Sequence, residues 1–274
     1  MNNLKIAFIG GGNMARSLIS GLIKAGYDSN LISVSNRSEG KLIALNKDFG
    51  IKTSLDNYEI AKDADVIVLA VKPQFMAEML NQLTAKINDY GNRLIISLAA
   101  GVTVERLTGL LNGHKKIVRL MPNTPALIGY GVTGTFAALD VNAEEKEFTN
   151  RILTAVGKVV WVGKESDINT VTAASGSSPA YFFLFMQYLI EHTKEMGLSE
   201  EQARTLVVET ALGAAQMAIK NADVSLETLR AQVTSKGGTT FAAISKFEEL
   251  NLKDSVSAAM DACVARAEEM QKLF

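Results

Sequence analysis

The feature that most constrains the fold is a short apolar run that ends in three consecutive glycines. The run Ile6-Ala7-Phe8-Ile9 is typical of a strand that is buried on both faces, as in a parallel sheet covered by helices on each side. It continues into Gly10-Gly11-Gly12-Asn13-Met14-Ala15, which fits the pattern G-x-G-x-x-A. Apolar residues then recur every four positions until Gly26, which predicts a helix closed by a glycine. Strand, glycine turn and helix together predict a site for the pyrophosphate of a dinucleotide at the helix N-terminus.

The small residues of this turn have separate predicted roles. Gly10 allows a tight turn, and Gly12 removes a Cβ so that the backbone can approach a pyrophosphate. Ala15 permits close packing of the helix on the sheet. A glycine-rich turn is also compatible with a mere connection, but the strand before it and the helix after it favour dinucleotide binding.

Apolar runs alternate with helical patterns through the first 160 residues. After the first strand, we expect strands over residues 31–35, 66–71, 94–98, 116–120, 133–137 and 159–162. The alternation predicts right-handed crossovers and a Rossmann-type, doubly wound, mainly parallel sheet. From about Lys164 onward the patterns are helical only. We therefore expect an α/β dinucleotide-binding domain over 1–163 and an all-helical domain over 164–274.

The helical region contains recognisable helix starts and ends. Ser178-Pro179 can open a helix and Gly197 can close it. Ser199 and Gln202 have the spacing of a capping box, which predicts the start of a second long helix.

The residues after the second expected strand indicate which dinucleotide is bound. A carboxylate at this place bonds the ribose 2′-hydroxyl of NAD, whereas an arginine accommodates the 2′-phosphate of NADP. The chain has Ser35-Asn36-Arg37-Ser38 there, with no acid before Glu39. This segment favours NADPH, with NADH possible as a second cofactor, although Arg37 as a solvated loop residue is the alternative.

A second polar loop lies in the helical half. Thr234-Ser235-Lys236-Gly237-Gly238-Thr239-Thr240 combines adjacent glycines with threonines immediately before a helical pattern. Backbone N–H groups and hydroxyls in such a loop can bind a carboxylate. The alternative is an ordinary loop between helices with a threonine cap.

Composition excludes several classes of function. Lys and Arg number 28 against 29 Asp and Glu, so the chain lacks the basic excess of a nucleic-acid binder. A single cysteine and two histidines support neither a disulfide framework nor a zinc cluster, and we expect no metal. The apolar runs are shorter than the ~20 residues that a membrane span requires. We expect a cytoplasmic protein with neither nucleic acid nor membrane as partner.

Six segments stand in a characteristic order and spacing: IGGGNMA, AVKPQ, SLAAGVT, RLMPNTPA, SGSSPAY and TSKGGTT. In these segments, and over essentially its whole length, the chain resembles the pyrroline-5-carboxylate reductase family. The resemblance implies reduction of 1-pyrroline-5-carboxylate to L-proline, the last step of proline biosynthesis, with NADPH usually preferred. It also implies a homodimer or higher homo-oligomer in which the helical domain interlocks with a second subunit.

The resemblance assigns residues to cofactor and substrate. The cofactor would be held by Ile9, Gly10, Gly11, Gly12, Asn13, Met14, Asn36, Arg37, Asn57, Ala70, Val71, Lys72, Pro73, Leu98, Ala99 and Ala100. The substrate would be held by Asp223, Ser235, Gly237, Gly238, Thr239 and Thr240, with the Thr240 hydroxyl near the ring nitrogen as the catalytic group.

The chain departs from the family at two of its positions. Lys236 replaces a proline that many relatives have, which makes the loop less rigid. Asp223 is one methylene shorter than the glutamate of some members.

Two other functions are compatible with the same two-domain plan. A β-hydroxyacid dehydrogenase-like oxidoreductase needs a general base, typically a lysine of the helical domain, and Lys194, Lys220 and Lys236 are available. A non-catalytic dinucleotide-binding protein would bind NADPH without turnover.

Overall fold

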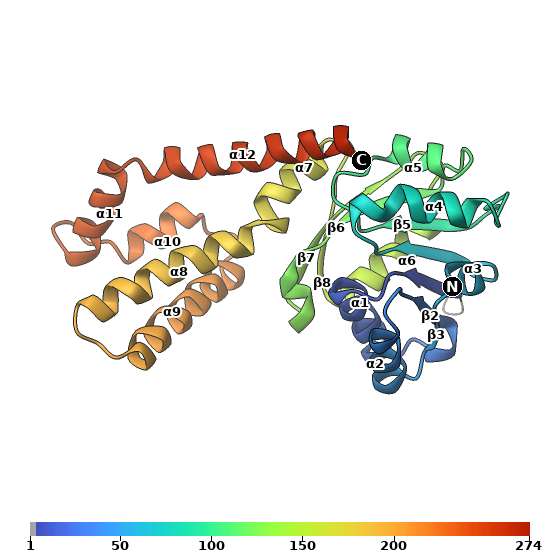
Figure 1. Cartoon of the computed structure of the whole chain (residues 1–274). Coiled ribbons are helices and arrows are strands. Elements are labelled where there is room, and N and C mark those ends of the chain that lie inside the picture. Colours follow the sequence, from blue (N-terminus) through green and yellow to red (C-terminus); the bar gives the residue numbers. More distant parts are fainter. Residues whose placement is uncertain (1–3) are drawn as a thin grey trace. The chain divides into compact units, whose positions relative to one another are not determined.

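The computed structural model describes residues 4–274, in which eight strands form one sheet of order β3-β2-β1-β4-β5-β6-β7-β8 (Figure 1). The strands are β1 (Ile6–Ile9), β2 (Ile32–Ser35), β3 (Lys52–Ser54), β4 (Val66–Leu69), β5 (Leu94–Ser97), β6 (Ile117–Met121), β7 (Gly131–Ala137) and β8 (Gly157–Trp161). Strands β1 to β6 run parallel, β7 is antiparallel to β6, and β8 is parallel to β7. The doubly wound, mainly parallel sheet predicted from the sequence is confirmed.

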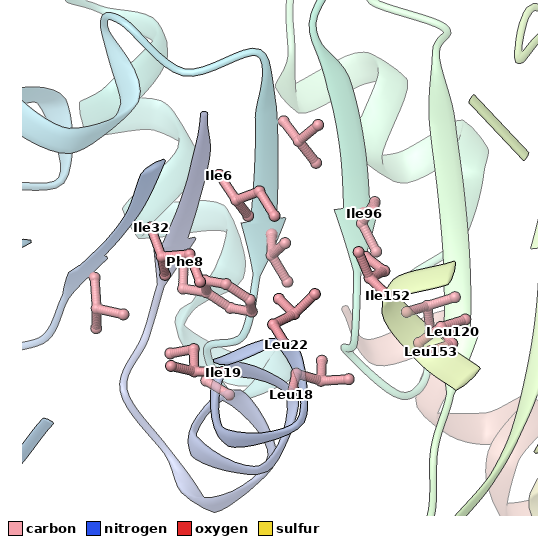
Figure 2. Close-up of a cluster of buried hydrophobic side chains, with 14 of the residues drawn as sticks. Ile6, Phe8, Leu18, Ile19, Leu22, Ile32, Ile96, Leu120, Ile152 and Leu153 are labelled. Atoms are coloured by element: carbon pink, nitrogen blue, oxygen red, sulfur yellow. The ribbon is translucent and has the colours of Figure 1, made fainter. Parts of the chain in front are cut away.

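Helices cover both faces of the sheet. One core is built with α1 (Asn13–Lys24), α2 (Glu39–Phe49) and α6 (Ala143–Thr154), and the other with α3 (Asn57–Ala61), α4 (Met76–Thr84) and α5 (Val104–Leu110). Successive residues of β1 alternate between them, because side chains alternate across a strand. Ile6 and Phe8 lie in the first core (Figure 2), and Ala7 and Ile9 lie in the second. Burial on both faces explains why β1 reads as a continuous apolar run.

Two expectations for the strands were wrong in detail. Strand β3 was missed because Lys52-Thr53-Ser54 is a polar edge strand without an apolar pattern. The strand expected over 66–71 ends at Leu69, where the chain turns toward the 3-10 helix η2 (Pro73–Phe75). Pro73 has no N–H to donate to a neighbouring strand and restricts the residue before it, so the sheet cannot continue there. The bounds of the other expected strands differ by at most two residues at either end.

The second half of the chain is helical, as expected. Its elements are α7 (Asp167–Val171), the π-helical turn η4 (Thr172–Gly176), α8 (Ser178–Glu195), α9 (Glu200–Lys220), α10 (Leu226–Gln232), α11 (Thr239–Glu249) and α12 (Leu252–Leu273). The first half also contains the short 3-10 helices η1 (Ser29–Leu31) and η3 (Thr124–Ile128). The capping box of α9 is present, with Gln202 N–H donating to Ser199 Oγ at 3.2 Å and Ser199 N–H donating to Gln202 Oε1 at 3.0 Å.

Contacts divide the chain into two compact units. The first contains the residues up to Pro179 together with Ala262–Phe274, and the second is Ala180–Asp261. Helix α7 belongs to the first unit, where Val171 packs so closely on Gly134 of β7 that a Cβ there would lie 2.3 Å from its side chain. The end of α12 joins the same unit, and Gln271 Nε2 donates to Asn169 Oδ1 at 2.9 Å. The division into functional domains at 1–163 and 164–274 stays a prediction.

Candidate active site

The glycine turn after β1 has the conformation that a phosphate loop requires. Gly10 has φ of +107°, a region that residues with a side chain rarely adopt, and a Cβ there would lie 2.6 Å from the Ala70 carbonyl oxygen. Gly12 is the N-cap of α1, no side chain caps this helix, and a Cβ on Gly12 would meet nothing within 4 Å. The first N–H groups of α1 are therefore open to an anion, whose charge the helix dipole also favours.

The loop after β2 is tied to this turn. Gly11 N–H donates to Asn36 Oδ1 at 3.2 Å, and Asn36 Nδ2 donates to the Ser38 carbonyl at 3.2 Å. Ser35 Oγ donates to Asn57 Oδ1 at 2.6 Å, which adds the start of α3 to the same cluster. The expected pyrophosphate and adenosine residues are thus brought together with Asn57, which was expected on the path toward the nicotinamide, at the carboxyl ends of β1, β2 and β3.

Arg37 extends from this loop toward the segment that follows β4. Its guanidinium lies over the Phe75 ring, 4.7 Å from the centroid, and its Nη2 lies 3.5 Å from Glu78 Oε2. The Arg37 side chain remains 69% exposed, so its N–H groups are accessible. Sequence reasoning singled out Arg37 but missed Phe75 and Glu78, which no motif marks.

Apart from Asn57, the residues expected along the nicotinamide path follow β4 and β5, which are neighbours in the sheet. Ala70 N–H donates to the Ile9 carbonyl at 2.8 Å, and Leu98 N–H donates to the Leu69 carbonyl at 3.0 Å. Ala99 is buried, and its N–H donates to Ser97 Oγ at 3.3 Å. The carboxyl edge of the sheet, where open α/β sheets bind ligands, therefore carries all the expected cofactor residues.

A buried ion pair lies beside the Ala99–Gly101 segment and was not expected from the sequence. Arg119 of β6 is 2% exposed, and its Nη1 lies 2.5 Å from Glu165 Oε1. The same oxygen accepts the N–H of Val104, the first residue of α5, at 2.7 Å. Arg119 also lines a cavity of about 190 Å³ together with Ala99 to Gly101 and residues of α12. Its only signal in the sequence is a single charge within the apolar run of β6.

The expected substrate loop lies in the second unit. Gly237 has φ of +76°, and Gly238 N–H donates to the Ser235 carbonyl at 3.0 Å, which closes a turn. Gly238 is the N-cap of α11, again without a side-chain cap, so Thr239 and Thr240 are the first two helical residues and both are exposed. The threonine cap considered as an alternative is absent from this helix. Asp223 lies in a separate exposed turn between α9 and α10.

Other kinds of site find no support in the described residues. Residues 4–274 hold no group of three His, Cys, Asp or Glu side chains that could bind a metal ion. Burial lowers the pKa of His114, whose Nε2 has no hydrogen-bond partner in the described part of the chain. Within the same residues, no helix has the length and apolar character needed to cross a membrane.

Comparisons with known proteins identify the family. Residues 165–270 match the family model described as pyrroline-5-carboxylate reductase dimerisation, and residues 5–101 match the model described as NADP oxidoreductase coenzyme F420-dependent. A pyrroline-5-carboxylate reductase of Vibrio alginolyticus is 49% identical over 274 residues, which cover the whole of both chains. The structure of a pyrroline-5-carboxylate reductase from Coxiella burnetii is 44% identical with a TM-score of 0.91, over 98% of each chain. That of the Plasmodium falciparum enzyme with NADP bound is 30% identical with a TM-score of 0.87, over 99% of each chain. The chain therefore belongs to the pyrroline-5-carboxylate reductase family.

Proposed function

We propose that this protein reduces 1-pyrroline-5-carboxylate to L-proline with NADPH, as the last step of proline biosynthesis. The observation that carries the proposal is the joined cluster at the carboxyl edge of the sheet. There an uncapped helix N-terminus follows the Gly10 turn, and Asn36 links that turn to the loop of Arg37. This cluster belongs to a chain that matches relatives named for the reaction over its full length.

The residues of the cluster fit the pyrophosphate and the 2′-phosphate of NADPH. Open N–H groups at the start of α1 suit the pyrophosphate, and Gly12 leaves room for its approach. The exposed guanidinium of Arg37 suits the 2′-phosphate, because arginine binds phosphate through paired N–H groups. The segments 70–73 and 98–100 would line the path to the nicotinamide.

The loop before α11 fits the carboxylate of the substrate. The backbone N–H groups of Thr239 and Thr240 begin a helix of 11 residues after the N-cap Gly238, and the helix dipole favours a negative charge there. Ser235 and Gly237 shape the turn that presents these groups. Asp223, in the turn between α9 and α10, would contact the substrate away from its carboxylate.

Thr240 would act on the ring nitrogen. Formation of proline requires a hydride at C5 and leaves a proton on the nitrogen, and bound NADPH supplies the hydride. A protonated C=N is already electrophilic, so the protein needs no strong acid and contributes mainly through positioning. The Thr240 hydroxyl accepts a hydrogen bond from the ring N–H and so orients the ring.

The experiment follows NADPH absorbance with 1-pyrroline-5-carboxylate, and NADH is tested in parallel. The expected result is rapid oxidation that is faster with NADPH. Thr240→Ala should lower kcat/KM, whereas Thr240→Ser, which keeps the hydroxyl, should retain most of it. Wild-type turnover in Thr240→Ala would contradict the role of Thr240, and no turnover with either cofactor would contradict the function.

A dehydrogenase acting on a 3-hydroxy acid is the alternative that this assay separates. It needs a lysine able to give up its proton, but Lys194 Nζ lies 2.5 Å from Glu200 Oε2. The hydrogen bond from Lys194 to Glu200 raises the pKa of the lysine, which favours the protonated form and disfavours a general base. Oxidation of a 3-hydroxy acid by the purified protein would favour this alternative.

The protein would act as a cytoplasmic homo-oligomer assembled through its helical half. Helix α8 exposes Phe182 and Phe183 at 66% and 62%, and α9 exposes Leu206 and Leu212 at 55% and 54%. Apolar surfaces of this kind mark protein–protein interfaces. Light scattering on the purified chain should give at least twice the monomer mass of 29.5 kDa, and a monomer at micromolar concentration would contradict the assembly.

A further inference from the structure

Arg37 is held from two sides by residues that follow β4. The Phe75 ring lies under its guanidinium, with 4.7 Å between the centroid and Cζ. Glu78 reaches its edge, with 3.5 Å between Arg37 Nη2 and Glu78 Oε2. The three residues cluster although Arg37 and Glu78 are 41 positions apart.

The sheet order explains this meeting. Strands β2 and β4 both pair with β1, so the loops at their carboxyl ends flank the glycine turn. Phe75 ends η2 and Glu78 lies in the first turn of α4. Met76, between them in the chain, is 1% exposed and anchors this segment in the core. The two side chains therefore stand on fixed backbone beside the more exposed Arg37.

The two contacts have opposite consequences for an anion at Arg37. Stacking uses the face of the guanidinium and leaves its N–H edge free, so Phe75 orients the group without occupying a donor. Glu78 engages one N–H of Arg37 at a distance longer than an ordinary hydrogen bond. When a phosphate binds, this contact must break, or the N–H must be shared between Glu78 and the phosphate. Because a phosphate carries about −1.5 to −2 charges at pH 7, it is also repelled by the carboxylate.

We propose that Phe75 and Glu78 set the preference for NADPH over NADH by acting on Arg37 in opposite directions. Phe75 raises the preference by holding the guanidinium ready for the 2′-phosphate. Glu78 lowers it by competing for that guanidinium and by repelling the phosphate. The inference rests on the proposed function, in which Arg37 meets the 2′-phosphate of the cofactor.

The test measures kcat/KM for NADPH and for NADH at saturating 1-pyrroline-5-carboxylate and fixed, low ionic strength. Phe75→Leu should lower the NADPH-to-NADH ratio roughly two- to fivefold, the range of an exposed cation–π contact. Glu78→Gln should raise the ratio by about 1.5- to 5-fold, the range of an exposed ion pair. Both shifts should appear in KM for NADPH, and added salt should weaken the effect of Glu78→Gln.

Three variants control for indirect effects. Phe75→Tyr keeps an aromatic face and should keep the wild-type ratio. Glu105→Gln removes an exposed acid from the first turn of α5, as Glu78→Gln does in α4, and should leave the ratio unchanged. In an Arg37→Ala background, Phe75→Leu should change the ratio less than twofold, since it acts through the guanidinium.

The outcomes separate this inference from the proposed function. If Arg37→Ala leaves the NADPH-to-NADH ratio at its wild-type value, then Arg37 does not meet the 2′-phosphate. The role of Arg37 in the proposed function and the inference about Phe75 and Glu78 are then both wrong. If Arg37→Ala collapses the ratio while Phe75→Leu and Glu78→Gln leave it unchanged, only the inference is overturned. Equal losses with NADPH and NADH in Phe75→Leu would also overturn it, because they would show a purely structural role.

Discussion

Replacement of Arg119 by methionine should destabilise the first unit strongly, because it leaves a carboxylate without its cation. Arg119 is almost fully buried in β6, and Glu165 accepts from its guanidinium and from the backbone of Val104. Methionine fills a similar length of apolar stem and creates little new cavity. The variant therefore reports mainly the loss of the charge partner.

The magnitude follows from the burial of the two partners. Breaking a buried ion pair by removing one member costs roughly 3–5 kcal/mol. Glu165 keeps 27% of its side chain exposed, so water solvates part of its charge and the loss should fall at the lower end. We expect a loss of about 3 kcal/mol in the free energy of unfolding. For a domain of roughly 150–250 residues this lowers Tm by about 6–12 °C.

The assay is thermal and urea denaturation of Arg119→Met, Glu165→Gln and the double variant. Glu165→Gln keeps an oxygen acceptor for Arg119 and for Val104 but leaves the 2%-exposed guanidinium without a counter-ion, so it should also destabilise the protein. Each substitution should cost less in the presence of the other, because the double variant leaves neither charge unpaired. A loss below about 1 kcal/mol in Arg119→Met would refute the reasoning. It would indicate that water in the adjoining cavity of about 190 Å³ already screens the pair.

Two further predictions concern the glycine turn and the half-buried His114. Gly10→Ala should cost about 1–3 kcal/mol and raise KM for NADPH, because its φ of +107° and the nearby Ala70 carbonyl both oppose a side chain. Gly40→Ala on α2, where a Cβ meets nothing within 4 Å, is the control and should be neutral or slightly stabilising in the same melts. Burial lowers the pKa of His114 below its ordinary 6.5, so the unfolded chain binds its proton first as pH falls. Stability should therefore fall as pH drops below about 6.5, and less steeply in His114→Gln; equal slopes in both proteins would contradict this account.

The sheet and the glycine turn were predictable because their signals are local. A strand buried on both faces is apolar throughout, and Ile6–Ile9 is such a run. The glycine turn follows it directly, so its geometry depends on only a few adjacent residues. The edge strand β3 was not predictable in this way, since Lys52–Ser54 is short and polar and is defined by its pairing with β2.

The expected site residues fall into two classes for the same reason. The segments after β1, β2, β4 and β5 were predicted to form one cofactor surface, and the parallel order places them at one edge of the sheet. The roles of Thr240 and Asp223 came from the resemblance, and their turns lie in the second unit, apart from any strand. The roles of Thr240 and Asp223 therefore stay predictions, and the kinetics of Thr240→Ala test the first of them.

The contacts that sequence reasoning missed are ion pairs between segments distant in the chain. Arg119 and Glu165 are 46 positions apart, and Arg37 and Glu78 are 41 apart. In each pair the charged residue that approaches the arginine comes from a loop or first helical turn beyond another strand, so no spacing within one element reveals it. A doubly wound order nevertheless limits the search, because β1 must have β2 on one side and β4 on the other. An arginine after β2 should then be examined against aromatic and acidic residues after β4, and in this chain that rule selects Phe75 and Glu78.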